Sequence, residues 1–494
     1  SDARALRVTG LARSGGAAMV RAMRAIICLL ICCVLGALQV SAAPKPEEVA
    51  VLYNLAVPDS RKIAELYQEA RGIPAPNLIA LEMPVAADIS RGEYDARIAE
   101  PLRDVFDRRG WWRRTVDANG VKLPVVNKIR VLVTVKGVPL RIKQTPQPKP
   151  PEGSPAPKNK DPFKGHDEAS VDSELAMFGV EGVPTEGVLE NKFYKAGDQS
   201  ITGTAFPYLI LTARIDAPKT STCERMIRDA WETEKTGLWG MSYVDVSKKY
   251  PMGDQWMEAV ARLNLEAGVP VVIDRFKDTF PKNYPMGAAA AMYHGWYDWH
   301  VSGPFLNPQF TLKKGAIAIH LHSFSAQQLR NPKQHWCGPL LEKGAAVTVG
   351  NVWEPYLHLT HDLAVLHDRL LKGDCWVEAC WKAMPAASWQ GVVLGDPLYT
   401  PFRHLQGTGE MTEEDKGFRA LRAAVIRWNQ SDAERGKQLE KAAERTRNGL
   451  FLEALGLDLL ERKRTADAMA QFRKAKALYV TSEDKLRQDF HLVA

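Results

Sequence analysis

Short β-rich runs alternate with amphipathic helical segments from Val49 onward, and this alternation limits the possible fold more than any other feature of the chain. The run VAVLYN at 49–54 comes first, and Ile63, Leu66 and Tyr67 follow it at helical spacing. Repeated strand and helix units are typical of a parallel sheet, because parallel neighbours need a crossover connection. The sequence therefore predicts an α/β fold with a mostly parallel sheet flanked by helices, and a small all-helical segment at its C-terminal end.

The further strands are expected where short apolar runs precede a turn or helix signal. They lie at 78–83, 129–135, 206–213, 239–246, 269–274, 315–322, 345–350 and 391–395, with one more ending at Tyr293-His294-Gly295. Asp59 or Ser60 is expected to cap the first helix, and Ser90 with Glu93 fits a capping box. The sequence leaves the direction of each strand open.

The first 42 residues have the pattern of a bacterial secretory signal. Arg21 and Arg24 precede an apolar run at 25–38 that is too short for a membrane span, and Ala42 follows at a small-residue cleavage site. Residues 1–18, which lack an initiator methionine, are interpreted as upstream read-through. We therefore expect an exported protein, periplasmic or extracellular, with no membrane span in the mature chain.

Removal of this leader changes the charge and the cysteine content. It takes away five of the 65 basic and one of the 58 acidic side chains, so the remaining chain carries a net charge of +3. A nucleic-acid partner is therefore not expected. Two disulfides or four buried thiols are equally open for the remaining cysteines, Cys223, Cys337, Cys375 and Cys380.

Composition divides the rest of the chain into two regions. Residues 43–404 are expected to form the α/β domain, with a mobile surface loop at 143–168 that is rich in proline and lysine. Residues 405–494 are expected to be helical. They contain a pattern similar to one tetratricopeptide repeat, with small residues where two helices approach: Leu455, Gly456, Ala468, Phe472 and Ala475. An ordinary amphipathic hairpin is the alternative, and a single repeat would have to pack on the α/β domain.

Polar residues follow three successive expected strands. His294 ends the first, His322 and Ser323 end the second, and Asn351 with Glu354 follows the third. Ligands of open α/β sheets gather at the carboxyl ends of strands. If the strands are parallel, these five side chains are expected to share a catalytic pocket.

His320 and His322 stand at positions i and i+2 of one expected strand, a spacing that suits either of two roles. They could chelate a metal ion, or they could be hydrogen-bonded histidines in a polar layer. No acidic residue lies close in sequence to complete a metal site. We therefore predict no metal and no other cofactor.

Five further residues are candidate ligand-binding positions: Lys136, Asp172, Glu174, Trp296 and Asp396. Asp172 and Glu174 begin a helix, where they could line a cleft or only stabilise the helix dipole. Asp396 lies in a Gly-Asp-Pro sequence, in which an aspartate more often caps a turn. Seven of the thirteen tryptophans lie between Trp296 and Trp389, which suits stacking on a sugar as well as an ordinary core.

Several motifs in a fixed order resemble known proteins. KGVPLRI, VDSELA, HLHSFSA, GNVWEPYL and LGDPLY resemble an uncharacterised family of exported bacterial proteins over residues 47–402. More distantly, the order strand-His-Gly, strand-Ser, GAAVTVG and LGDPLY is similar to gingipain-like cysteine peptidases of the caspase-like fold. That resemblance implies a hydrolase in which His294 takes the histidine position. The position of the nucleophilic cysteine falls at His322 or Ser323, where this chain has no cysteine.

Two functions are consistent with these observations. The first is an exported hydrolase of a peptide or glycan, in which Ser323 replaces the cysteine and His294 or His322 is the base. The alternative is a non-catalytic binding or scaffold protein of the cell envelope that docks a protein partner through its C-terminal helices. The sequence has no P-loop, Rossmann fingerprint, nucleophile elbow or His-Glu-x-x-His motif, which argues against nucleotide, lipase-type and zincin chemistry.

Overall fold

The computed structural model describes residues 43–493 except 148–161, 205, 407–409 and 411. The predicted signal segment and the central part of the predicted loop at 143–168 lie outside the described residues. The two flanks of that loop are tied together, since Gln144 Nε2 donates to Gly165 O at 2.6 Å. Within the described part of the chain, no helix is both long and apolar enough to cross a membrane.

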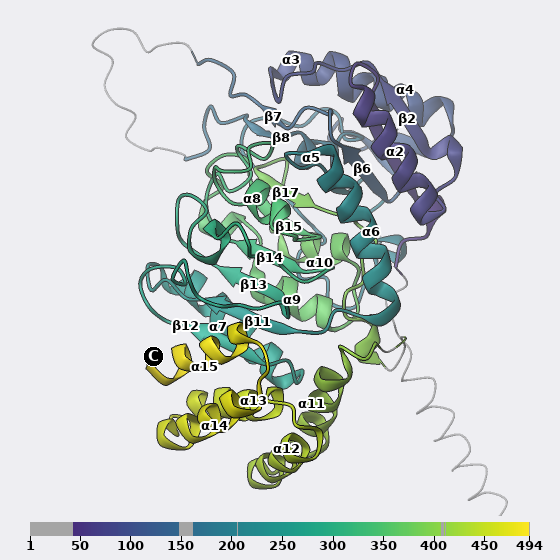
Figure 1. Ribbon diagram of the computed structural model, residues 1–494. Helices are drawn as coiled ribbons and strands as arrows, with labels where there is room; N and C mark the ends of the chain where they lie inside the picture. Colours follow the sequence, from purple (N-terminus) through teal and green to yellow (C-terminus); the bar gives the residue numbers. More distant parts are fainter. Residues whose placement is uncertain (1–42, 148–161, 205, 407–409, 411, 494) are drawn as a thin grey trace, which may run out of the picture. The chain divides into compact units, whose positions relative to one another are not determined.

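Two groups of mostly parallel strands form the centre of the fold (Figure 1). The first has the order β15-β17-β10-β6-β1-β2, with β1 (Val49–Asn54), β2 (Leu78–Leu81), β6 (Val131–Val135), β10 (Leu211–Ile215), β15 (Thr348–Asn351) and β17 (Gly391–Leu394). The second has the order β12-β11-β13-β14, with β11 (Met241–Asp245), β12 (Val271–Asp274), β13 (Ala290–Gly295) and β14 (Ile317–His320). The predicted α/β class with a mostly parallel sheet is confirmed.

The strand β15 reverses the direction of the sheet. It is antiparallel to β17, while a bridge between Ile317 and Val347 connects it to β14 in parallel. The carboxyl ends of β11 to β15 therefore share one edge, and those of β1, β6, β10 and β17 share the opposite edge. This reversal separates the predicted site residues, because Lys136 follows β6 whereas His322 follows β14.

Helices cover both faces of the sheet, which explains why its strands are continuously apolar. Val49 and Val51 of β1 pack with α2 on one face, and Ala50 and Leu52 pack with Phe106 of α4 on the other. The helices of this region are α2 (Pro58–Arg71), α3 (Arg91–Tyr94), α4 (Glu100–Arg108), α5 (Val171–Leu175), α6 (Thr220–Thr236), α7 (Pro251–Glu266), α8 (Cys337–Glu342), α9 (Leu363–Leu371) and α10 (Trp376–Ala383). Short peripheral strands complete it: β3 (Asp88–Ile89), β4 (Trp112–Val116), β5 (Lys122–Asn127), β7 (Arg141–Ile142), β8 (Ala169–Ser170), β9 (Leu189–Glu190) and β16 (Ala386–Ala387).

Two helix starts show which local signals hold in the structure. The capping box of Ser90 and Glu93 is present, as predicted. The prediction of a cap at Asp59 or Ser60 is wrong, since α2 begins at Pro58, whose fixed φ suits the first helical position. The Ser60 hydroxyl instead accepts a hydrogen bond from Asn54 N at 2.9 Å and joins the helix to the end of β1.

All four described cysteines are buried free thiols, so the alternative of two disulfides is wrong. Burial raises the pKa of the Cys337 thiol to about 12 and that of Cys380 well above its ordinary value. These thiols are components of the core, and they are not nucleophiles at neutral pH.

The C-terminal segment is helical, with α11 (Lys416–Arg427), α12 (Asp432–Thr446), α13 (Leu450–Glu461), α14 (Thr465–Leu478) and α15 (Ser482–Val493). Gly456 lies where α13 approaches α14, and a Cβ atom there would be 2.5 Å from the Phe472 ring. The segment packs on the α/β region, because Glu461 pairs with Arg275 at 2.8 Å and Phe490 packs edge-on against Tyr284 at 5.1 Å. Its membership of the tetratricopeptide family, and the domain boundary at 404, stay predictions.

Candidate active site

A cavity of about 220 Å³ lies at the shared edge where β13, β14 and β15 end. We call it the aromatic pocket. It is lined by Tyr250, Trp296, Tyr297, Leu321, His322, Ser323, Asn351, Glu354, Pro355, Tyr356, Leu357 and Thr360. Four of the five predicted catalytic residues therefore lie together, since β14 and β15 are parallel as their joint site requires.

The His322 ring is fixed in orientation and in tautomer. Its Nδ1 lies 2.9 Å from the carbonyl oxygen of Ser323, and a carbonyl only accepts, so Nδ1 carries the hydrogen. The rings of Tyr297 and Trp299 pack against it at 4.9 and 4.8 Å. In the neutral ring Nε2 is therefore a hydrogen-bond acceptor, and it has no partner among the described residues.

Burial and the nearby carboxylates have opposite effects on the protonation of His322. Burial lowers the pKa of His322, and the carboxylates of Glu354 and Asp298 partly oppose this shift. The side chain is thus unprotonated at neutral pH, with negative charge nearby to stabilise an imidazolium once it forms.

Ser323 and Asn351 lie in the pocket but lack the arrangement of a catalytic dyad. Within the described part of the chain the Ser323 hydroxyl has no hydrogen-bond partner, and His322 bonds to the Ser323 carbonyl instead. The Asn351 amide is buried, and it exchanges hydrogen bonds with the Thr360 hydroxyl at 2.8 and 3.2 Å. Asn351 therefore shapes the floor of the pocket, and the geometry does not activate Ser323 as a nucleophile.

Glu354 lies at the exposed rim of the pocket. Its Oε1 accepts a hydrogen bond from Tyr356 N at 3.1 Å. A hydrogen bond fixes the position of the following Pro355, because Trp389 Nε1 donates to its carbonyl at 2.9 Å. The turn at Glu354-Pro355 thus presents a carboxylate toward the pocket.

His294 is not among the residues that line the pocket, which corrects the expectation that all five side chains share it. Side chains alternate along a strand, so His294 of β13 points to the face opposite Tyr293. There it is fully buried, and its ring packs edge-on against His367 at 5.2 Å. Burial lowers the pKa of His294 to about 3, and neither ring nitrogen has a described hydrogen-bond partner.

His320 lies behind the pocket and takes part in a series of hydrogen bonds that runs from Asp298 N to Asp245. Its Nε2 accepts from Asp298 N at 3.0 Å, so its Nδ1 carries the hydrogen that faces the Tyr293 hydroxyl at 3.0 Å. The hydroxyl lies 3.3 Å from Asp245 Oδ2, and the His320 ring stacks on Trp336 at 3.4 Å. Both ring nitrogens of His320 are occupied, so in this arrangement it has no free nitrogen with which to chelate a metal ion together with His322. Of the described residues, no group of three or more His, Cys, Asp or Glu side chains is arranged to hold a metal ion.

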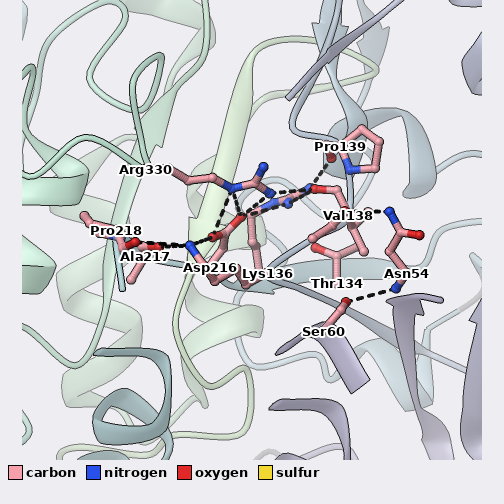
Figure 2. A network of polar contacts seen from close by, with 12 residues as sticks. Asn54, Ser60, Thr134, Lys136, Val138, Pro139, Asp216, Ala217, Pro218 and Arg330 are labelled. Carbon is pink, nitrogen blue, oxygen red and sulfur yellow. Dashed lines mark hydrogen bonds and ion pairs between the residues drawn. The ribbon is translucent and has the colours of Figure 1, made fainter. Parts of the chain in front are cut away.

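Lys136 and Asp172, predicted as ligand-binding residues, belong to a largely buried polar network at the opposite edge of the sheet, and Figure 2 shows the part of it around Lys136 and Asp216. Lys136 Nζ donates to the Ala217 carbonyl at 2.7 Å, and Asp172 pairs with Arg214 at 2.7 Å. Figure 2 shows Arg330 reaching Asp216 in the same network, at 2.8 Å. These charges neutralise one another across β6, β10 and a loop, so they join elements of the fold rather than face a ligand.

The other three predicted binding residues have different surroundings. Glu174 accepts from the Ser388 hydroxyl at 2.6 Å and pairs with Arg91. Asp396 is buried, and its Oδ1 accepts from Leu398 N at 3.0 Å, which fits the predicted turn cap, as well as from the Tyr67 hydroxyl at 2.9 Å. Trp296 alone lies in the aromatic pocket, where its Nε1 donates to Asp254 at 3.0 Å.

Sequence reasoning missed the aromatic residues of the pocket and its rim. Tyr250, Tyr297, Trp299 and Tyr356 follow β11, β13 and β15, in the turns that begin at the shared edge. The signal was present, since each predicted strand that ends at this edge is followed within a few residues by an aromatic side chain. A count of tryptophans alone did not separate these turn residues from the core.

Comparisons with family models and with curated proteins find no match. Among solved structures, the chain is similar to one described as "Structure of Protease". The two share 11% sequence identity with a TM-score of 0.40, over 73% of this chain and 79% of that chain. The fold and the pocket define the class of the molecule as an α/β protein with a candidate ligand site at the carboxyl ends of its strands.

Proposed function

We propose that this chain is an exported hydrolase whose active site is the aromatic pocket and whose general base is His322. One observation supports this most strongly: Nδ1 of His322 is bound to a backbone carbonyl, which leaves Nε2 as an unpartnered acceptor in a ring that lines the pocket. Export rests on the signal pattern of residues 19–42.

The reaction that fits this geometry uses water as the nucleophile. Nε2 of His322 takes a proton from a water molecule as the water oxygen attacks the bond to be cleaved. Glu354 and Asp298 stabilise the imidazolium that forms, because both carboxylates favour the charged ring. The imidazolium then returns its proton to the leaving group, so the base is regenerated.

Covalent catalysis has less support at this site. None of the four described cysteines lines the pocket, and all four are buried. Ser323 lines the pocket, but its hydroxyl lacks the bond to a base that activates a serine nucleophile.

The test is hydrolysis of peptide and glycan libraries by the purified protein and by His322→Asn. The asparagine amide can still donate to the Ser323 carbonyl, but it lacks the proton acceptor. We expect a fall in kcat/KM of about 100-fold or more. An unchanged thermal unfolding curve controls for the fold, and unchanged activity in a folded variant would remove His322 from the mechanism.

A non-catalytic binding protein is the second candidate, favoured by the lack of activation of Ser323. It predicts a ligand that binds the pocket and is never turned over, with the C-terminal helices docking a protein partner. Binding of a ligand, with no hydrolysis product formed from any member of the substrate libraries, would favour this candidate over the hydrolase.

A further inference from the structure

Three exposed aromatic side chains surround the aromatic pocket. Tyr250 is 51% exposed, Trp299 52% and Tyr356 36%. Large apolar side chains gathered at one exposed place mark an interaction site more often than scattered ones do. They lie in three different turns, after β11, β13 and β15, and these turns begin at the shared edge of the sheet.

Neighbouring rings hold these three side chains in place. Tyr250 packs on Tyr297 at 5.6 Å, and Tyr356 packs on Phe163 at 5.9 Å. Trp299 packs on Phe324 at 5.6 Å and on His322 at 4.8 Å. These edge-on and tilted ring contacts restrict the rotamers, so little side-chain entropy is lost when a flat ligand binds. The rim is thus a set of fixed aromatic surfaces beside a small polar pocket.

The pocket offers hydrogen-bond acceptors and no fixed positive charge. Its free acceptors are His322 Nε2 and the second oxygen of the Glu354 carboxylate, and the hydroxyls of Ser323, Tyr250, Tyr297 and Tyr356 can donate or accept, while no lysine or arginine lines it. The nearby Lys249 ammonium is directed to the Tyr297 carbonyl at 2.8 Å. An anionic ligand would therefore find no opposite charge among the lining residues and would face the Glu354 carboxylate, and an apolar ligand would leave the acceptors unpaired. A ligand with several hydroxyl donors and flat apolar faces fits both the floor and the rim.

The sheet gives an extended peptide no edge to pair with beside the pocket. β13 lies between β11 and β14, β14 is bridged to β15, and β15 pairs with β17. A peptide that binds as an added strand needs an unpaired edge. The volume of about 220 Å³ is also below the roughly 300–1,000 Å³ of most ligand pockets, and it suits a single ring.

From these observations we infer that the aromatic pocket takes one ring of a neutral, O-acylated glycan, and that Tyr250, Trp299 and Tyr356 stack on the neighbouring rings. The identity of the cleaved bond rests on the proposed function, which is hydrolysis with His322 as the general base. Glycosidic hydrolysis uses a pair of carboxylates, whereas Glu354 is the single carboxylate among the lining residues.

The cleaved bond is therefore an ester on the sugar. Water adds to the acyl carbonyl as His322 Nε2 takes its proton, and the tetrahedral intermediate then expels the sugar oxygen. That oxygen receives the proton from His322, so the products are a carboxylic acid and a free sugar hydroxyl. No oxidant, reductant or further reactant is needed.

The test uses tetramers of β-1,4-linked N-acetylglucosamine with and without O-acetyl groups, titrated calorimetrically into the whole protein. We expect Trp299→Ala to weaken binding roughly 10-fold. The matched control is Trp231→Ala, whose side chain is 42% exposed on α6 and lies over Lys235. It should bind as the wild type does, and acetate release should be lost in His322→Asn.

Three outcomes separate this inference from the proposed function. If the tetramers do not bind while peptides are hydrolysed in a His322-dependent way, the glycan inference is wrong and the hydrolase stands. Release of reducing ends instead of acetate would overturn the ester. Tetramer binding that depends on Trp299, with no hydrolysis of any substrate, would support the ligand class and contradict the hydrolase.

Discussion

His322 combines the properties that a general base needs. Its tautomer is fixed by the Ser323 carbonyl, its rotation is limited by Tyr297 and Trp299, and its proton acceptor is left free. Burial lowers its pKa, so the neutral form predominates at neutral pH. The histidine of β13, His294, is fully buried, so its ring is not accessible to a substrate in the pocket.

The first prediction concerns Glu354 and the acidic limb of the activity profile. Activity requires neutral His322, so kcat/KM should fall as the pH drops through the pKa of this ring, which lies below 6.5. Glu354 raises that pKa, and Glu354→Gln should therefore move the acidic limb to lower pH. The measurement is kcat/KM against pH for both proteins. A limb that moves to higher pH, or stays in place, would contradict the pairing.

The second prediction concerns His294 and stability in acid. Burial lowers its pKa from 6.5 to about 3, so the unfolded state binds a proton below pH 6.5 and the folded state does not. Stability from this group is fully present above 6.5 and is lost as the pH falls toward 3. His294→Leu should weaken the loss of unfolding free energy between pH 7 and 5, measured with urea. An equal loss in wild type and variant would show that His294 is not held neutral.

At the scale of elements, the pair α13 and α14 depends on the absence of a side chain at Gly456. A Cβ there would be 2.5 Å from the Phe472 ring, while a Cβ at Gly436 of α12 would be 3.6 Å from Leu455, an ordinary contact. Gly456→Ala should destabilise the protein by about 1–3 kcal/mol. Gly436→Ala should instead stabilise it by about 0.5–1 kcal/mol, because alanine is the better helix former. Urea unfolding measures both, and equal effects would contradict the close approach.

The strands could be predicted because their apolar runs are buried on both faces, and β1 agrees with its prediction at both ends. The prediction at 206–213 began too early, since a turn precedes Leu211 and Pro207 cannot donate to a strand ladder. The reversal at β15 could not be predicted, because pairing with β14 and β17 depends on contacts distant in sequence. For the same reason Lys136 and His322 could not be assigned to opposite edges.

At the scale of the whole molecule, the β15 reversal creates two edges with different chemistry. One edge carries the aromatic pocket, and the other carries the neutralised charges of Lys136, Asp172, Arg214 and Asp216. Ion pairs that are fully buried and mutually satisfied fix an arrangement more than they bind ligands. Of the two edges, the one with the aromatic pocket is therefore the candidate site of catalysis.

Export is predicted for the whole chain and has its own test. The pattern of residues 19–42 predicts cleavage after Ala42. On expression in a bacterium, the protein in the periplasm or medium should begin at Ala43, as determined by N-terminal sequencing. Protein that stays in the cytoplasm with residues 19–42 attached would contradict export.

The central claim is that His322 activates water in the aromatic pocket without a covalent intermediate on Ser323. Its most direct test is kcat/KM for wild type, His322→Asn and Ser323→Ala on one substrate, with folding checked for each. We predict a loss of about 100-fold or more for His322→Asn and activity close to wild type for Ser323→Ala. Full activity in His322→Asn, or abolished activity in a folded Ser323→Ala, would contradict the account.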